Sequence, residues 1–182
     1  MDVVVAQGTE AGGHNYGTAG TIALTPAIVD AVGGKSMVIA SGGIADGRGL
    51  AAALMLGADG VWVGTRFVAT AESAAADLYK ERLVQAGTAD TAITHMFGRN
   101  HPDFNPMRVL RNRVVAEWSE RAEEVPADNS AEPVIGHMDL LGQPTDLLRF
   151  GNLVPMTGAT GDFDELPLLA GEGVGLVGDV PR

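Results

Sequence analysis

Residues 37–65 read MVIASGGIADGRGLAAALMLGADGVWVGT, and the order of segments in this stretch decides the fold class. An apolar run from Met37 to Ala40 is followed by a glycine turn, by an Ala- and Leu-rich segment over about 49–56, and by a second apolar run over 60–63. Uniformly apolar runs are typical of parallel strands buried on both faces, and such strands need a crossover helix between them. The stretch therefore predicts a strand–helix–strand unit.

The same alternation continues on both sides of this unit. Residues 3–6, Val-Val-Val-Ala, predict an earlier strand. Thr25-Pro26 predicts a helix start, with threonine as the cap and proline in the first turn, and this helix should end at Gly33-Gly34. Thr70 is expected to cap a further helix that runs to about residue 86. Three strand–helix pairs in succession predict an α/β fold with a parallel sheet.

The pattern changes after Gly98. Asn105-Pro106 predicts the start of a helix that reads MRVLRNRVVAEW, and residues 125–133 read as a linker rich in small residues and proline. The remaining chain has several glycines and prolines. We therefore expect two regions, the βα units over residues 1–98 and a helical and irregular C-terminal extension over residues 99–182.

Composition excludes several classes of function. The chain of 182 residues has no cysteine, which excludes disulfides, thiolate metal sites and a cysteine nucleophile and fits a cytoplasmic location. The net charge of −11 argues against nucleic acid or a membrane surface as a partner. Residues 1–116 hold ten acids and nine bases, whereas residues 117–182 hold thirteen acids and three bases, so the acidity belongs to the C-terminal region. A solvated surface is the simplest interpretation of that acidity.

Glycine turns follow two neighbouring strands. Ser41-Gly42-Gly43 comes after the second predicted strand and Gly64-Thr65 after the third. Glycine lets the backbone turn sharply and bring its N–H groups close to an anion, although either turn alone is equally compatible with a simple tight connection. Because the carboxyl ends of parallel strands meet at one edge of the sheet, the pair favours a phosphate site.

The stretch AQGTEAGGHNYG, residues 6–17, carries the candidate proton acceptor. His14 follows the first predicted strand beside Gly12-Gly13, which leave room for a planar ligand. An imidazole with an ordinary pKa near 6.5 suits proton abstraction at neutral pH. Glu10 either orients this imidazole, caps a loop or is a surface residue. The other histidines have no companions at metal-ligand spacing, so we expect no metal site and read His95, His101 and His137 as structural or surface residues.

Four other side chains have ordinary structural interpretations. Asp46 is expected to cap the helix after Gly43, and Arg66 to pair with a neighbouring acid. Trp62 lies within a predicted strand, which favours core packing, and Tyr16 either packs or lines a pocket near the histidine.

The order and spacing of AQGTEAGGHNYG, ASGGIADGRGLAAALMLGADGVWVGTRF and ATAES resemble the nitronate monooxygenase family, formerly called 2-nitropropane dioxygenases. The resemblance is close over residues 1 to about 116 and weaker in the terminal GEGVGLV. It implies an FMN-dependent TIM barrel, of which this chain would be the C-terminal portion with about three βα units. It also implies that the family's earlier strands and ligand contacts would come from a complementary N-terminal half-barrel or from a homo-oligomer.

The resemblance assigns roles to residues in the three loops. His14 would be the catalytic base or would hydrogen-bond the nitro group of the substrate. FMN would be contacted by residues at the ends of the three strands: Gln7, Gly12 and Gly13, then Ser41, Gly42 and Gly43, then Trp62, Val63, Gly64 and Thr65. Trp62 departs from the residue common in the family, so its contact is expected through the backbone.

The implied reaction is the oxidation of an alkyl nitronate by O2 to a carbonyl compound and nitrite. Flavin-dependent enoyl-acyl-carrier-protein reductases and quinone reductases, which use NAD(P)H, have similar loops and remain an alternative. Inosine monophosphate dehydrogenase is excluded because it needs a cysteine. A non-catalytic half-barrel that needs a partner chain is the second alternative, and on this view the isolated chain binds FMN weakly or not at all.

Overall fold

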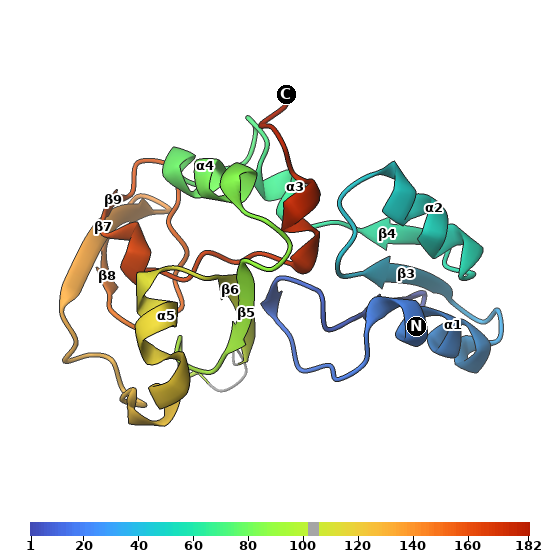
Figure 1. Ribbon diagram of the computed structural model, residues 1–182, viewed down its shortest axis with the longest axis horizontal. Coiled ribbons are helices and arrows are strands. Elements are labelled where there is room, and N and C mark those ends of the chain that lie inside the picture. The colour runs from blue at the N-terminus through green and yellow to red at the C-terminus, as the bar shows by residue number, and fades with distance from the viewer. Residues whose placement is uncertain (102–105) are drawn as a thin grey trace.

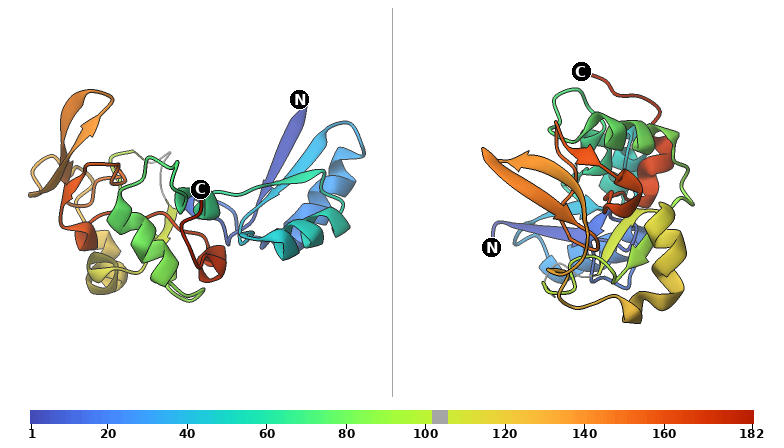
Figure 2. Two further views of the ribbon diagram at one scale, coloured as in Figure 1. Left: turned by 90° about the horizontal axis from the view of Figure 1, so that it is seen from above. Right: turned by 90° about the vertical axis from the view of Figure 1, so that its left-hand side faces the viewer.

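The computed structural model describes residues 1–101 and 106–182. It is elongated, with an α/β unit at one end and the remaining elements at the other (Figures 1 and 2). No helix in the described part of the chain is long and apolar enough to cross a bilayer. The strands of the described residues form three three-stranded sheets, with the orders β1-β3-β4, β2-β6-β5 and β8-β7-β9.

The first sheet is the predicted parallel one. Its strands are β1 (Val3–Gln7), β3 (Met37–Ser41) and β4 (Gly60–Trp62), and both pairings are parallel. Helices α1 (Thr21–Val32) and α2 (Gly47–Met55) cover one face. The strand–helix–strand prediction is therefore confirmed. The described residues form an α/β fold without a closed barrel.

The other face of this sheet is apolar and open. Val3, Val5, Met37 and Trp62 lie on it and are exposed, Trp62 to 63%. On the helix-covered face, by contrast, Ala6, Val38 and Ala40 are buried. Alternate residues of a strand point to opposite faces. Both faces of the sheet are therefore apolar, but helices cover only one of them.

Helix α1 begins at Thr21, one turn earlier than predicted from Thr25-Pro26. The local cap, Gly20, has no side chain, and the Glu10 carboxylate accepts hydrogen bonds from the Thr21 N–H at 2.9 and 3.0 Å instead. Thr25 lies within the helix and donates its hydroxyl to the Thr21 carbonyl at 2.8 Å. The cap comes from 11 residues earlier in the connection between β1 and α1, outside the local pattern that marks a helix start.

Of the helix predicted over 70–86, only residues 77–85 are helical, as α4 (Asp77–Gln85), and a short helix α3 (Thr65–Val68) comes before the predicted start. Between them, backbone N–H groups donate to distant carbonyls: Ala71 to Pro181 at 2.8 Å and Ala76 to Pro155 at 3.1 Å. Tertiary hydrogen bonds thus replace the helical ones, despite the helix-favouring alanines.

The helix predicted from Asn105 is also wrong for its first half. Asn105 itself lies outside the described residues. Residues 107–110 form strand β6 (Met107–Leu110), which pairs antiparallel with β2 (Gly13–His14) and β5 (Thr91–Thr94). All four β6 residues are buried. A helix follows at α5 (Arg113–Trp118), capped by the Asn112 side chain, which accepts from the Val115 N–H at 3.1 Å.

The C-terminal region contains strands where a helical and irregular extension was predicted. A hairpin of β7 (Val134–Leu140) and β8 (Gln143–Leu148) pairs with the short β9 (Thr160–Gly161). The predicted linker over 125–133 includes the buried residues Val125 and Asn129. The two predicted regions share a sheet, because β5 pairs with β6; the boundary at residue 98 stays a prediction.

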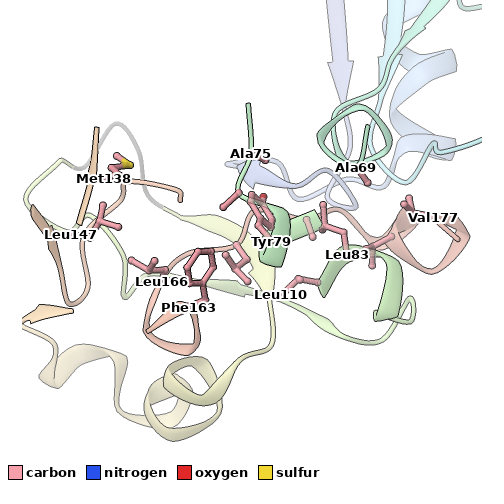
Figure 3. Packing of buried hydrophobic residues seen from close by; sticks show 14 of the residues in the cluster. Ala69, Ala75, Tyr79, Leu83, Leu110, Met138, Leu147, Phe163, Leu166 and Val177 are labelled. Carbon is pink, nitrogen blue, oxygen red and sulfur yellow. The ribbon is translucent and has the colours of Figure 1, made fainter. Parts of the chain in front are cut away.

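The main apolar core lies in this part of the molecule. Figure 3 shows Tyr79 and Leu83 of α4 beside Leu110 of β6, with Phe163 and Leu166 packed against them. Phe163 belongs to the 3₁₀ helix η3 (Phe163–Glu165). After α5 comes the 3₁₀ helix η2 (Ser119–Glu124), and near the C-terminus lies η4 (Glu172–Leu176). This core fixes the C-terminal segment close to the parallel sheet (Figure 1).

Candidate functional site

The carboxyl ends of the three parallel strands meet at one cavity. Gln7, Ser41 and Trp62 are register partners across β1, β3 and β4 and end the strands in one row. A cavity of about 470 Å³ opens beside this row. It brings together eight of the predicted ligand-binding residues: Gln7, Gly12, Ser41, Gly42, Gly43, Trp62, Gly64 and Thr65.

The first glycine turn has the backbone geometry that its composition predicts. Gly42 and Gly43 have φ angles of 113° and 70°, which favour glycine. A Cβ atom at Gly42 would lie 2.8 Å from the Thr21 hydroxyl and 3.0 Å from the Ala11 nitrogen. Among the described residues, the N–H groups of Gly43 and Gly64 donate to no protein acceptor. They are therefore available to a ligand in the cavity.

Asn15 and Arg108 fix the loop between β1 and α1. The Asn15 amide donates to the carbonyls of Gly8, Thr9 and Ala11 at 3.0 to 3.2 Å, and its side chain is buried. The Arg108 guanidinium donates twice to the Thr9 carbonyl, at 2.8 and 3.0 Å. Loop conformation is thus held by buried side chains and not by a regular element.

Glu10 is a capping residue of helix α1. Its carboxylate accepts from both the N–H and the hydroxyl of Thr21 at the start of α1. A carboxylate at a helix N-terminus also interacts favourably with the helix dipole. Of the interpretations left open by the sequence, the structure supports a capping role, at the start of α1.

We expect Glu10→Ala to lower the free energy of unfolding by about 1–2 kcal/mol, because Thr21 loses its cap. Urea unfolding followed by circular dichroism measures this change. The matched control is Asp30→Ala, which removes an exposed carboxylate near the other end of the same helix and should change stability by less than about 0.5 kcal/mol. Equal effects of the two variants would contradict the capping role.

The C-terminal segment forms a wall of the cavity that the sequence did not predict. Leu169, Gly171 and Gly173 line the cavity together with the two glycine turns. The Gly171 N–H donates to the Thr65 hydroxyl at 2.9 Å, and the Glu172 N–H donates to the Glu10 carbonyl at 2.9 Å. The available signal was the GEGVG stretch, whose glycines permit close approach between backbones.

His14 lies next to the cavity but not on its wall. It ends β2, and its carbonyl accepts from the Gln7 side chain at 3.0 Å, so Gln7 connects it to the cavity-lining row. Partial burial lowers the pKa of His14 below its ordinary value of 6.5. Gly13 and Val63, the other two predicted ligand-binding residues, are also absent from the cavity lining.

Other expectations have mixed outcomes. Asp46 caps α2 through the N–H groups of Arg48 and Gly49, and Arg66 pairs with Asp179 at 2.8 Å, both as predicted. The prediction that Trp62 packs in the core is wrong, because its indole lies on the open face of the sheet. Tyr16 is exposed.

The other histidines lie outside the cavity lining. His95, His101 and His137 are exposed, and His137 contacts Asp146 at 2.8 Å. The described residues contain no group of three potential metal ligands from His, Cys, Asp and Glu.

Comparison with known proteins decides the family. A family model described as nitronate monooxygenase matches residues 1–181. The chain belongs to the nitronate monooxygenase family. The resemblance seen in the loops is therefore confirmed, and the family is one of flavin-dependent oxidoreductases.

Three relatives define the extent of the similarity. A probable nitronate monooxygenase of Staphylococcus saprophyticus is 38% identical over 136 residues, which are 69% of this chain and 36% of that protein. A Mycobacterium tuberculosis protein, (3aS,4S,5R,7aS)-5-hydroxy-7a-methyl-1-oxo-octahydro-1H-indene-4-carboxyl-CoA dehydrogenase, is 47% identical over 115 residues, 63% of this chain and 31% of that protein. The structure of FabK from Thermotoga maritima matches with a TM-score of 0.70 and 34% identity, covering 100% of this chain and 50% of that one.

The chain thus spans about a third of the curated relatives and half of the solved structure. Its α/β fold corresponds to that half.

Proposed function

We propose that this chain is the C-terminal portion of the TIM barrel of a nitronate monooxygenase. It would supply the binding site for the phosphate group of FMN and the residue that accepts a proton from the substrate. The observation that carries the proposal is the convergence of the Ser41–Gly43 and Gly64–Thr65 turns on one cavity beside His14. Family membership and the probable nitronate monooxygenases among the relatives support it.

The residues of the cavity fit a phosphorylated cofactor. The left-handed turn at Gly42-Gly43 and the N–H groups of Gly43 and Gly64 form a backbone cradle, and a dianionic phosphate group is stabilised by such N–H donors without a metal. Gln7, Gly12 and Trp62 would border the flavin. When bound, FMN would take electrons from the nitronate and pass them to O2, while the protein provides binding and orientation.

His14 would interact with the substrate beside the flavin. Its lowered pKa keeps the imidazole neutral at pH 7, so the ring can accept a proton from a neutral nitroalkane. The same ring could instead hydrogen-bond the nitro group of a nitronate, which has already lost its proton. The products of nitronate oxidation are a carbonyl compound and nitrite.

The acidic limb of activity should lie below pH 6.5. A histidine with a lowered pKa stays in its proton-accepting form as the pH falls, until the pH reaches that lowered pKa. We therefore expect the acidic limb of kcat/KM for a neutral nitroalkane to have its midpoint below pH 6.5. A profile of kcat/KM against pH measures this, and an acidic limb centred above 6.5 would contradict the assignment of His14 as the base.

The open face of the parallel sheet is the proposed docking surface for the rest of the barrel. Val3, Val5, Met37 and Trp62 give it an apolar surface, and closing a barrel would bury them as inward-facing residues. A complementary half-barrel is the partner that fits this face, with a second copy of the chain as the alternative outcome. The catalytic constellation would be complete only in that assembly, in the cytoplasm.

Co-expression with a complementary half-barrel tests the proposed function. We expect nitronate-dependent O2 uptake with stoichiometric release of nitrite from the assembly and none from the chain alone. An assembly that binds FMN but consumes no O2 with nitronates would overturn the proposed reaction while leaving the cofactor site in place.

A second candidate function is favoured by the 47% identical mycobacterial relative, which is named as a CoA-thioester dehydrogenase. A flavin-dependent oxidoreductase that acts on thioesters would use the same phosphate cradle. If it works as a reductase, NAD(P)H would be its electron donor. NADPH oxidation in the presence of an enoyl thioester, without response to nitronates, would select this candidate.

A further inference from the structure

The C-terminal strap, residues 169–173, packs backbone against backbone on two of the loops that line the cavity. A Cβ atom at Gly171 would lie 2.7 Å from the Glu10 carbonyl oxygen, and one at Gly173 would lie 2.8 Å from the Gly43 carbonyl oxygen. On the facing loop, a Cβ atom at Gly12 would lie 2.5 Å from the Gly171 nitrogen. Only glycine allows this approach, so the strap and the loops constrain one another's positions.

The strap also contacts the second turn through one specific hydrogen bond. The Gly171 N–H donates to the Thr65 hydroxyl oxygen at 2.9 Å. A hydroxyl that accepts one hydrogen bond can still donate its own proton, and the Thr65 hydroxyl donates to no acceptor among the described residues. Because Thr65 and Gly171 both line the cavity, the bond leaves that proton for a ligand there.

An ion pair connects the strap to strand β6. Glu172 lies 3.0 Å from the guanidinium of Arg108, whose side chain is only 10% exposed. The same guanidinium donates to the Thr9 carbonyl and to the Thr91 hydroxyl. Arg108 therefore connects the strap, the first loop and the β5–β6 sheet.

We infer that the C-terminal strap is a positioning element of the phosphate site, which orients the Thr65 hydroxyl and holds the Gly43 turn so that both donate to one phosphoryl group. The inference rests on the proposed function, because the phosphoryl group is that of FMN. It adds a role for Gly171, Gly173 and Glu172, which lie more than 100 residues after the glycine turns in sequence.

Comparison of FMN with riboflavin, which lacks the phosphate, tests the inference in the Gly173→Ala variant of the chain assembled with its complementary half-barrel. The added Cβ should push the strap from the Gly43 turn and lower FMN affinity about 10- to 100-fold, the loss expected for a hydrogen bond to a charged group, with riboflavin affinity unchanged. Gly178→Ala is the matched control, since a Cβ there meets nothing within 4 Å.

Two outcomes would overturn the inference: an unchanged FMN affinity, or an equal loss for both flavins. If Gly173→Ala does not fold, Glu172→Asp replaces it, because it keeps the charge but shortens the reach to Arg108, and it should reduce FMN affinity alone. Failure of the proposed function is distinguishable: the unsubstituted assembly would bind FMN and riboflavin equally if it has no phosphate site, and it would bind FMN but consume no O2 with nitronates if only the proposed reaction is wrong.

Discussion

Replacing His14 with alanine is expected to lower the turnover of a neutral nitroalkane about 10²- to 10⁴-fold in the assembled enzyme, the usual range for loss of a general base. His14 ends β2 next to the cavity, and burial lowers its pKa so that it is neutral at pH 7. FMN content should not change, because the phosphate cradle belongs to other residues. Initial rates of O2 uptake and a flavin spectrum measure the two quantities.

The choice of substrate separates the two roles of His14. A preformed nitronate needs no proton abstraction, so a base predicts a much smaller loss with nitronate than with the neutral nitroalkane. A hydrogen bond to the nitro group predicts similar losses with both. The control His137→Ala removes an exposed histidine of the distant hairpin and should leave both rates unchanged. Unchanged rates in His14→Ala would remove His14 from the mechanism.

The second large effect is expected from Gly64→Asp. Gly64 lines the cavity with an unpaired N–H, and a carboxylate placed there would repel the phosphate of FMN. Two like charges about 4–6 Å apart near a protein surface repel by a few kcal/mol, so FMN affinity should fall at least about 100-fold. Equilibrium titration of the assembled protein with FMN, followed by flavin fluorescence, measures the loss.

Folding should survive this substitution. A Cβ atom at Gly64 meets nothing within 4 Å, and its φ of −95° suits any residue. Gly47→Asp is the matched control, because Gly47 also has open space around its Cβ and lies outside the cavity lining. We expect both variants to melt within a few degrees of the parent and only Gly64→Asp to lose FMN. Retention of FMN affinity in Gly64→Asp would exclude this turn from the phosphate site.

The parallel sheet was predictable because its signals are local. The runs at 3–6, 37–40 and 60–63 are short and apolar, and glycines mark their ends. The convergence of the two glycine turns followed from topology alone, since parallel strands end at a common edge. The cap at Asp46 was likewise a local feature of the sequence.

Three of the wrong predictions share a physical cause, which is hydrogen bonding to partners outside the local sequence pattern. Helix α1 starts where Glu10, 11 residues earlier, caps it, and residues 69–76 are not helical where distant carbonyls accept the N–H groups of Ala71 and Ala76. Strand β6 was hidden because Arg108 interrupts its apolar run, and that guanidinium is buried with partners in β5, the first loop and the C-terminal strap. No local pattern encodes such partners.

The β7–β8 hairpin was hidden for a different reason. Its turn has Leu141 at a φ of 55° followed by Gly142 at 84°, whereas Asn or Asp usually occupies the first of these positions. The Asp139 side chain, which accepts from the Gly142 N–H at 2.6 Å, stabilises the turn instead. The position of the strap at the cavity was also not predictable from the local sequence, because its glycines contact loops more than 100 residues away.

The most direct test of the central claim is an NMR titration of the ¹⁵N-labelled chain with inorganic phosphate, which detects weak binding in the isolated chain. If the two turns hold one phosphoryl group, the amide resonances of Gly43 and Gly64 should shift together along one saturation curve, while that of Gly47 stays in place. Shifts at only one turn, or two independent curves, would contradict the claim.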